Sequence, residues 1–262
     1  YYSGSIVEAL KATGHMACAC LLTFFLGCLK FYYDMKDLWN SLPMNMNKAM
    51  NHLVTTVSHK MVGMFYGMLG LAGLTWATIS SLIMRFELAS PGMRLIMSYD
   101  SYNVYVTLHG LIMIFGFAMP VLFGLYGNIL VPLLICSPEV GFAKLNNASY
   151  IIYASAMLLL IEAHLMDILT GLGWTLYPPL STAGTLLVCY GVTLAFVSLT
   201  VMGFSTTFTA ANYLATMIIR CTAMSAMPMT TIGTCVHAFA TTSVLLLMVL
   251  PVLAIVLVML LT

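Results

Sequence analysis

A single histidine, His109, lies about a turn and a half inside a long apolar segment. An imidazole in hydrocarbon is costly unless a partner satisfies its ring nitrogens, so this side chain needs one. A haem iron is one candidate, because neutral imidazole is a common axial ligand of haem. The alternative is a core histidine that bonds to a neighbouring carbonyl. The residue and its surroundings alone leave both interpretations open.

A second set of polar residues could carry protons. A carboxylate can bind and release a proton, and buried amides and hydroxyls can hold the waters that conduct it. The same side chains could instead cap helix ends or bond to the carbonyls of their own helices. The members of this set are Asn128, Glu139, Asn146, Ser205, Thr206 and Asn212.

Two charged residues, Arg85 and Glu87, come just before a Pro91–Gly92 turn. An arginine at the end of an apolar helix often extends its charged group to the membrane interface, and Glu87 could be a loop carboxylate. Each of these two residues therefore has two interpretations, a functional role or an ordinary place at the membrane interface or in a loop.

The composition indicates the environment in which these residues work. The chain is 61% hydrophobic and 6% charged, far below the charged share of soluble domains. These values predict an all-α integral membrane protein, and the net charge of +1 gives no reason to expect a nucleic-acid partner. The seven cysteines form no CxxC pair and are interpreted as packing residues.

Six segments have the roughly 20 predominantly apolar residues that a membrane-spanning helix needs. They are residues 14–33, 61–84, 103–134, 149–169, 184–218 and 231–261. Residues 1–50 are interpreted as an extension with one extra span, and 51–262 as a helical bundle. The excess of basic residues in alternate loops places one face in the matrix or cytoplasm. That face carries Lys30, Lys36, Lys48, Lys60, Lys144 and Arg220, and the opposite face carries Lys11, Arg85 and Arg94.

Glycines recur at three- and four-residue spacing in the second of these segments. Small residues at such spacing allow two helices to approach closely. The residues are Gly63, Gly67, Gly70 and Gly73, and they predict a helix-packing face.

Taken in order, several blocks of the chain resemble subunit I of the haem–copper oxidases, the family that includes cytochrome c oxidase. The most specific blocks are YNVYVTLHG and GLGWTLYPPL. The others, in family order and at near-family spacing, are SHKMVG, RFELASPG, GNILVP, SPEVGF and AANYLAT. The resemblance covers about 200 residues and implies that five of the six spans match helices I–V of the family bundle.

The resemblance implies roles around a low-spin haem a. His109 matches the family's axial ligand of the haem a iron, and Arg85 matches the arginine that bonds to the haem a formyl group. Trp174 lies in the loop that passes near the haem propionates. Glu87 and Gly92 match ligands of the family's Ca²⁺ or Na⁺ site.

The resemblance also implies a proton pathway. Glu139 occupies the position of the aspartate at the entrance of the D pathway and is one methylene longer. Asn128 and Asn146 match its asparagines, and Ser205, Thr206 and Asn212 match polar positions further along it.

Blocks that belong to later family helices are absent from the chain, including HPEVY and a His-His pair. These helices carry the second haem a ligand and the residues that bind haem a3 and the copper ion CuB. The chain is therefore expected to be the N-terminal half of a split subunit I, completed by a chain with the C-terminal half. The resemblance further implies oxidase subunits II and III as partners, cytochrome c as an indirect one, and the mitochondrial inner membrane as the location.

Two other classes of membrane protein would show different sequence patterns. A b-type membrane cytochrome would carry paired histidines on two helices, and the histidines here do not repeat in that way. A polytopic transporter would show inverted repeats or interrupted helices in corresponding halves, and none is evident. Haem content separates the three classes.

Overall fold

The computed structural model shows a bundle of long helices with no strand in the part of the chain that it describes. Residues described are 55–92, 95–96, 99–165, 171–178, 181, 186–223 and 233–261, without the side chains of 164–165, 186–190, 220–223 and 261. The predicted span at 14–33 and the extension at 1–50 lie outside these residues. The all-α prediction is confirmed.

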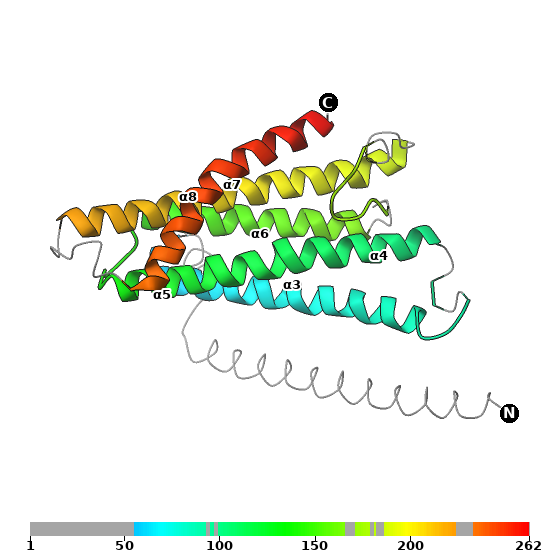
Figure 1. Ribbon diagram of the computed structural model, residues 1–262, viewed down its shortest axis with the longest axis horizontal. Helices are drawn as coiled ribbons and strands as arrows, with labels where there is room; N and C mark the ends of the chain where they lie inside the picture. Colours follow the sequence, from blue (N-terminus) through cyan, green and yellow to red (C-terminus); the bar gives the residue numbers. More distant parts are fainter. Residues whose placement is uncertain are drawn as a thin grey trace, which may run out of the picture. The chain divides into compact units, whose positions relative to one another are not determined.

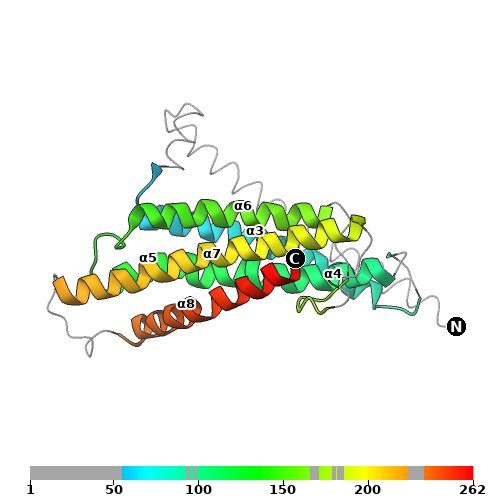
Figure 2. The ribbon, with the colours of Figure 1, turned by 90° about the horizontal axis from the view of Figure 1, so that it is seen from above.

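The helices run up and down the bundle (Figures 1 and 2). α3 (His59–Glu87) packs along the next helical stretch, α6 packs on α7, and α7 packs on α8. These last three helices span Ala143–Leu165, Leu186–Ala223 and Thr234–Leu261.

One continuous helical stretch, residues 99–134, contains the candidate haem ligand and Asn128. It begins as α4 (Tyr99–Leu111), widens into the π-helical turns η1 (Ile112–Ala118) and η2 (Pro120–Leu125), and ends as α5 (Tyr126–Leu134). A proline inside an α-helix removes a hydrogen bond and clashes with the carbonyl four residues earlier. We attribute the widening to Pro120, since a π turn relieves that clash.

The glycines of α3 face this stretch, as predicted from their spacing. Gly63, Gly67, Gly70 and Gly73 are all buried. A Cβ atom on Gly73 would lie only 2.6 Å from the carbonyl oxygen of Gly116. Glycine therefore allows α3 and η1 to approach until their backbones touch, which holds Ala77 against the helix of His109.

Four of the described helices are long and apolar enough to cross a membrane. They are His59–Glu87, Tyr99–Leu134, Gly191–Ile219 and Thr234–Leu260. They coincide with four of the six predicted segments. The described part of the segment predicted at 149–169 corresponds to α6, which is not among these four. The buried face of α6 carries polar side chains that contact α3 and α7.

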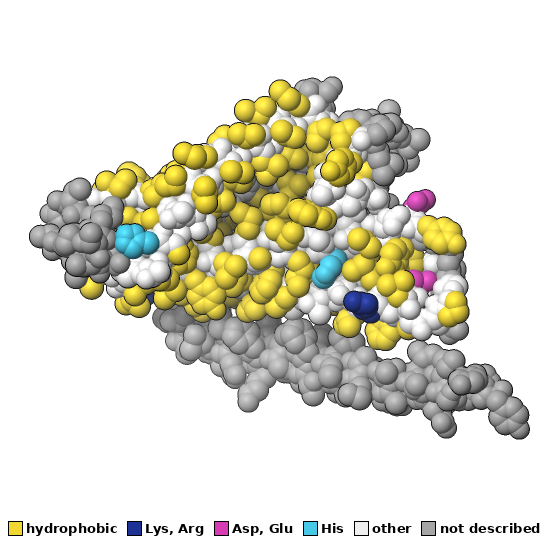
Figure 3. Space-filling view, in the orientation of Figure 1, with side chains coloured by type: hydrophobic (Ala, Val, Ile, Leu, Met, Phe, Trp, Pro, Cys, Tyr) yellow, Lys and Arg dark blue, Asp and Glu magenta, His cyan; other side chains and the backbone are white. Residues whose placement is uncertain are grey.

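The face of the molecule drawn in Figure 3 is largely hydrophobic among the described residues. α8 is the least enclosed span, with 17% of its most apolar window buried. Its exposed side chains include Leu245, Met248, Val252, Ile255 and Met259. Such a surface requires lipid or further helices around it.

Candidate functional site

His109 is half-buried on α4, and its ring is oriented by a bond to the neighbouring helix. Its Nδ1 lies 2.9 Å from the carbonyl oxygen of Ala77 on α3. A carbonyl can only accept, so Nδ1 must carry the proton in this bond and Nε2 must carry the lone pair. A core histidine would make this bond to a carbonyl. Metal-ligating histidines commonly make the same bond through the ring nitrogen that does not bind the metal.

The loop that carries Trp174 lies directly against the helix turn of His109. A Cβ atom on Gly110 would be 3.2 Å from the Cβ of Trp174, so the tryptophan side chain packs where that glycine leaves space. The Gly173 N–H donates to the Thr107 hydroxyl at 2.9 Å. The structure thus brings Trp174 next to His109, although 53% of the tryptophan is exposed.

Arg85 lies in the last turn of α3, two turns beyond Ala77 and towards the same end of the bundle as His109. Its side chain is exposed. Within the described residues its guanidinium makes no hydrogen bond or ion pair. The five donors of this group are therefore available to a ligand or to another chain.

Glu87 and Gly92 line the same open pocket. Two ligands of one cation site would have to lie close together in this way. The Oε2 atom of Glu87, however, accepts hydrogen bonds from the backbone N–H groups of Leu95 and Ile96, at 2.8 and 3.1 Å. Glu87 is the only carboxylate in the pocket lining, and Ca²⁺ takes six to eight oxygen ligands. The described residues contain no group of three or more His, Cys, Asp or Glu side chains that could hold a metal ion. These residues on their own do not fit a cation site.

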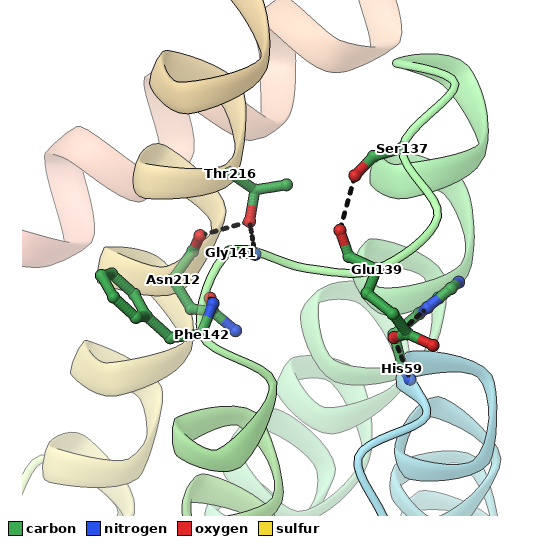
Figure 4. A network of polar contacts seen from close by, with 7 residues as sticks. All are labelled: His59, Ser137, Glu139, Gly141, Phe142, Asn212 and Thr216. Carbon is green, nitrogen blue, oxygen red and sulfur yellow. Dashed lines mark hydrogen bonds and ion pairs between the residues drawn. The ribbon is translucent and has the colours of Figure 1, made fainter. Parts of the chain in front are cut away.

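Glu139 lies at the opposite end of the bundle, in the loop between α5 and α6. The loop leaves α5 through Cys136, whose φ of 55° is the left-handed conformation that terminates many helices. The Glu139 Oε2 atom lies 2.8 Å from Nδ1 of His59, the first residue of α3, and accepts from the His59 backbone N–H at 3.1 Å (Figure 4). The Ser137 hydroxyl donates to the Glu139 carbonyl at 2.5 Å.

The other side of the same loop is held by α7 (Figure 4). The Gly141 N–H donates to the Thr216 hydroxyl at 2.9 Å, and the Phe142 N–H donates to Oδ1 of Asn212 at 2.8 Å. Both α7 side chains are buried. Asn212 therefore anchors the loop that presents Glu139, a role that the sequence did not predict.

Three buried asparagines lie on different helices of this part of the bundle, and each has amide atoms without a protein partner in the described chain. Asn128 donates to the Gly124 carbonyl through Nδ2, but its Oδ1 is unpaired. Both amide atoms of Asn146 and the Nδ2 of Asn212 are unpaired. A buried amide atom in a folded protein normally bonds to protein or to ordered water, so these groups are suited to bind water.

Hydroxyl groups form a buried cluster where α3, α6 and α7 meet. The Ser149 hydroxyl lies 2.9 Å from the Tyr66 hydroxyl and accepts from Thr209 at 3.2 Å. Ser205 donates to the Ser149 carbonyl at 2.6 Å. A small cavity of about 10 Å³, roughly the room for one water, is lined by Tyr66, Ser205, Thr206 and Thr209.

The sequence prediction missed Tyr66, Ser149 and Thr209 in this cluster, and His59 beside Glu139. Thr209 lies four residues after Ser205 on the same helix face, so that spacing was a usable signal. No signal in the sequence relates His59 to Glu139, because 80 residues separate them.

A family model described as cytochrome c and quinol oxidase polypeptide I matches residues 61–262. The chain is 33% identical over 204 residues to a protein of Plasmodium berghei named cytochrome c oxidase subunit 1, covering 77% of this chain and 42% of that one. It is 40% identical over 207 residues to the protein of that name in Pecten maximus, covering 75% and 41%. For the Candida albicans protein of that name the identity is 41% over 128 residues, covering 48% and 24%. The chain thus spans about two-fifths of the length of the first two relatives.

Proposed function

Because the chain belongs to the cytochrome c and quinol oxidase polypeptide I family, we propose that it supplies the haem-binding and proton-admitting helices of a cytochrome c oxidase. In this proposal the oxidase transfers electrons from cytochrome c to O₂ and moves protons across the mitochondrial inner membrane. The residues 14–33 and α6 complete six spans with the four apolar helices described above. The family match and the orientation of His109 together carry the proposal.

One end of the bundle is proposed to hold haem a. When bound, the haem carries electrons by cycling its iron between two oxidation states. His109 fits the part of axial ligand, because its bond to the Ala77 carbonyl leaves Nε2 as the atom with a lone pair. That bond also fixes the orientation of the imidazole ring. Arg85, whose guanidinium has no partner among the described residues, is proposed to bond to the haem a formyl group, and Trp174 to lie near the haem propionates.

The other end is proposed to admit protons. Glu139 is partly exposed and can exchange a proton with water. Asn128, Asn146 and Asn212 offer buried amide atoms to a water chain that leads inward from it. Ser205 and Thr206 continue this route at the cavity that Tyr66 also lines. About 28 Å of helix separate His109 and Asn128. Haem binding and proton entry are therefore proposed at different depths of the bundle.

The relatives extend well beyond the part that this chain matches. We propose that the helices equivalent to that remainder supply the second haem a ligand, haem a3 and CuB, and that subunits II and III join them. A cation at Glu87 and Gly92 would need further ligands from those helices. Mass spectrometry of the purified oxidase would establish whether they reside on a second polypeptide, as expected for a split subunit I.

The haem assignment is tested by His109→Ala in the assembled oxidase. The expected result is loss of the low-spin haem a band, because alanine has no ligand atom in place of Nε2. His237→Ala is the matched control, since His237 is exposed at the start of α8. An unchanged spectrum in His109→Ala would refute the assignment.

The entrance assignment is tested by Glu139→Ala, with Glu162→Ala as a control that removes a carboxylate near the other end of α6. The expected result is slowed proton uptake with unchanged haem content in Glu139→Ala alone. Normal proton uptake by Glu139→Ala would refute the entrance role.

A further inference from the structure

The proposed function gives a role to Glu139 but none to His59, which contacts it. Only 6% of the His59 side chain is exposed, against 45% for Glu139. Two donors of His59, the ring Nδ1 and the backbone N–H, are directed at the same carboxylate oxygen, Oε2. The other oxygen of Glu139 has no hydrogen-bond partner among the described residues.

We propose that His59 is a positioning residue for the proton entrance, holding one oxygen of Glu139 at the first turn of α3 and leaving the other open to water. This inference rests on the proposed function, because it assigns a role relative to Glu139 as the entrance. It identifies a residue that acts through Glu139.

The unpaired N–H groups at the start of α3 explain why a carboxylate binds at this end of the helix. The first N–H groups of a helix have no partner within the helix, and the helix dipole places partial positive charge at that end. Ser58 precedes the helix but makes no side-chain capping bond. Glu139 supplies the missing acceptor from a loop 80 residues away in sequence.

The length of the Glu139 side chain explains why its contact with His59 matters. Glutamate has one more rotatable bond than the aspartate of the family's entrance, and a longer side chain samples more conformations. Ser137 fixes the backbone of Glu139 and His59 fixes its carboxylate, so both ends of the longer side chain are restrained. The carboxylate therefore keeps a defined place at the mouth of the route.

The test compares His59→Leu with His59→Asn in the assembled oxidase, reconstituted in lipid vesicles. Leucine and asparagine are nearly the same size, but only asparagine has a side-chain N–H near the position of Nδ1. Loss of a hydrogen bond to a charged group predicts proton uptake slowed about tenfold in His59→Leu. His59→Asn should recover most of the rate. Both variants should retain the haem spectrum, and equal rates in the two would overturn the proposal.

A second comparison separates this inference from the proposed function. In a Glu139→Asp background the shorter side chain should no longer reach His59, so His59→Leu should cause no further slowing. An equal slowing in both backgrounds would show that His59 acts independently of the carboxylate and would overturn the proposal.

The single variants separate the two roles. If Glu139→Ala slows proton uptake but His59→Leu does not, Glu139 is the entrance and the positioning role of His59 is refuted. If Glu139→Ala takes up protons at the normal rate, the entrance role and the positioning role are both refuted. Should His59→Leu fail to assemble, His59→Phe keeps the ring volume and removes the same donor.

Discussion

Gly73→Ala tests whether the close approach of α3 and η1 holds the candidate haem ligand in place. A Cβ atom at this position would lie 2.6 Å from the Gly116 carbonyl oxygen, whereas ordinary contact begins at 3.4 Å. The difference, about 0.8 Å, is the distance by which the two helices would have to separate. Because both contact atoms at Gly116 nearest to the new methyl belong to the backbone, no side-chain rotation can relieve the clash.

The separation should break the bond that orients His109. Ala77 lies one turn after Gly73 on α3, and its carbonyl accepts from His109 at 2.9 Å. If α3 moves as a rigid helix, this distance becomes about 3.7 Å, which is too long for a hydrogen bond. The expected cost is about 1 kcal/mol for the lost bond, and the steric cost adds to it.

The assay is the melting temperature of the purified oxidase together with its low-spin haem spectrum. Gly73→Ala should lower the first and shift the second. Gly203→Ala is the matched control, because its Cβ atom would have its nearest neighbour at 4.0 Å. Alanine has a higher helix propensity than glycine by about 1 kcal/mol, so the control should be neutral or stabilising. If Gly73→Ala behaves like the control, the helices are not in backbone contact and the reasoning is wrong.

Three further changes have defined outcomes. Tyr66→Phe removes a hydroxyl that contacts Ser149 at 2.9 Å, and should lower the free energy of unfolding by about 1 kcal/mol in a thermal or denaturant melt. Gly110→Val places methyl groups where the Trp174 side chain packs, so proteolysis within the loop of Trp174 should become faster; an unchanged cleavage rate would contradict the packing. Glu87→Ala leaves two backbone N–H groups without their acceptor and should lower the melting temperature without changing the haem spectrum, whereas a lost haem band would mean that this turn helps to hold the haem.

Features that depend on local sequence were predictable. The glycine spacing of α3 predicted its packing face, and four of the six predicted apolar segments coincide with candidate spans. The GLGWTLYPPL block predicts Trp174 near a haem; that role stays a prediction, and the structure shows that Trp174 packs at Gly110, next to His109. Each of these rests on a periodicity or on a block of adjacent residues.

Features that depend on contacts between distant segments were not predictable. That Asn212 lines a proton route stays a prediction, and the sequence did not indicate that its Oδ1 also holds the loop of Glu139 while its Nδ2 is unpaired among the described residues. The bond from His109 to the Ala77 carbonyl requires the register of two helices, which a single sequence does not define. The widening around Pro120 was also missed, because a proline signals a break without specifying how the helix accommodates it.

The central claim is that this chain holds a low-spin haem through His109 as part of an oxidase. The most direct test is the reduced-minus-oxidised spectrum of the complex purified through this chain in a mild detergent, compared with the same preparation of His109→Ala. The account predicts a haem a signal in the first and loss of its low-spin component in the second. A haem b spectrum, or no haem at all, in the complex that contains the unaltered chain would contradict it.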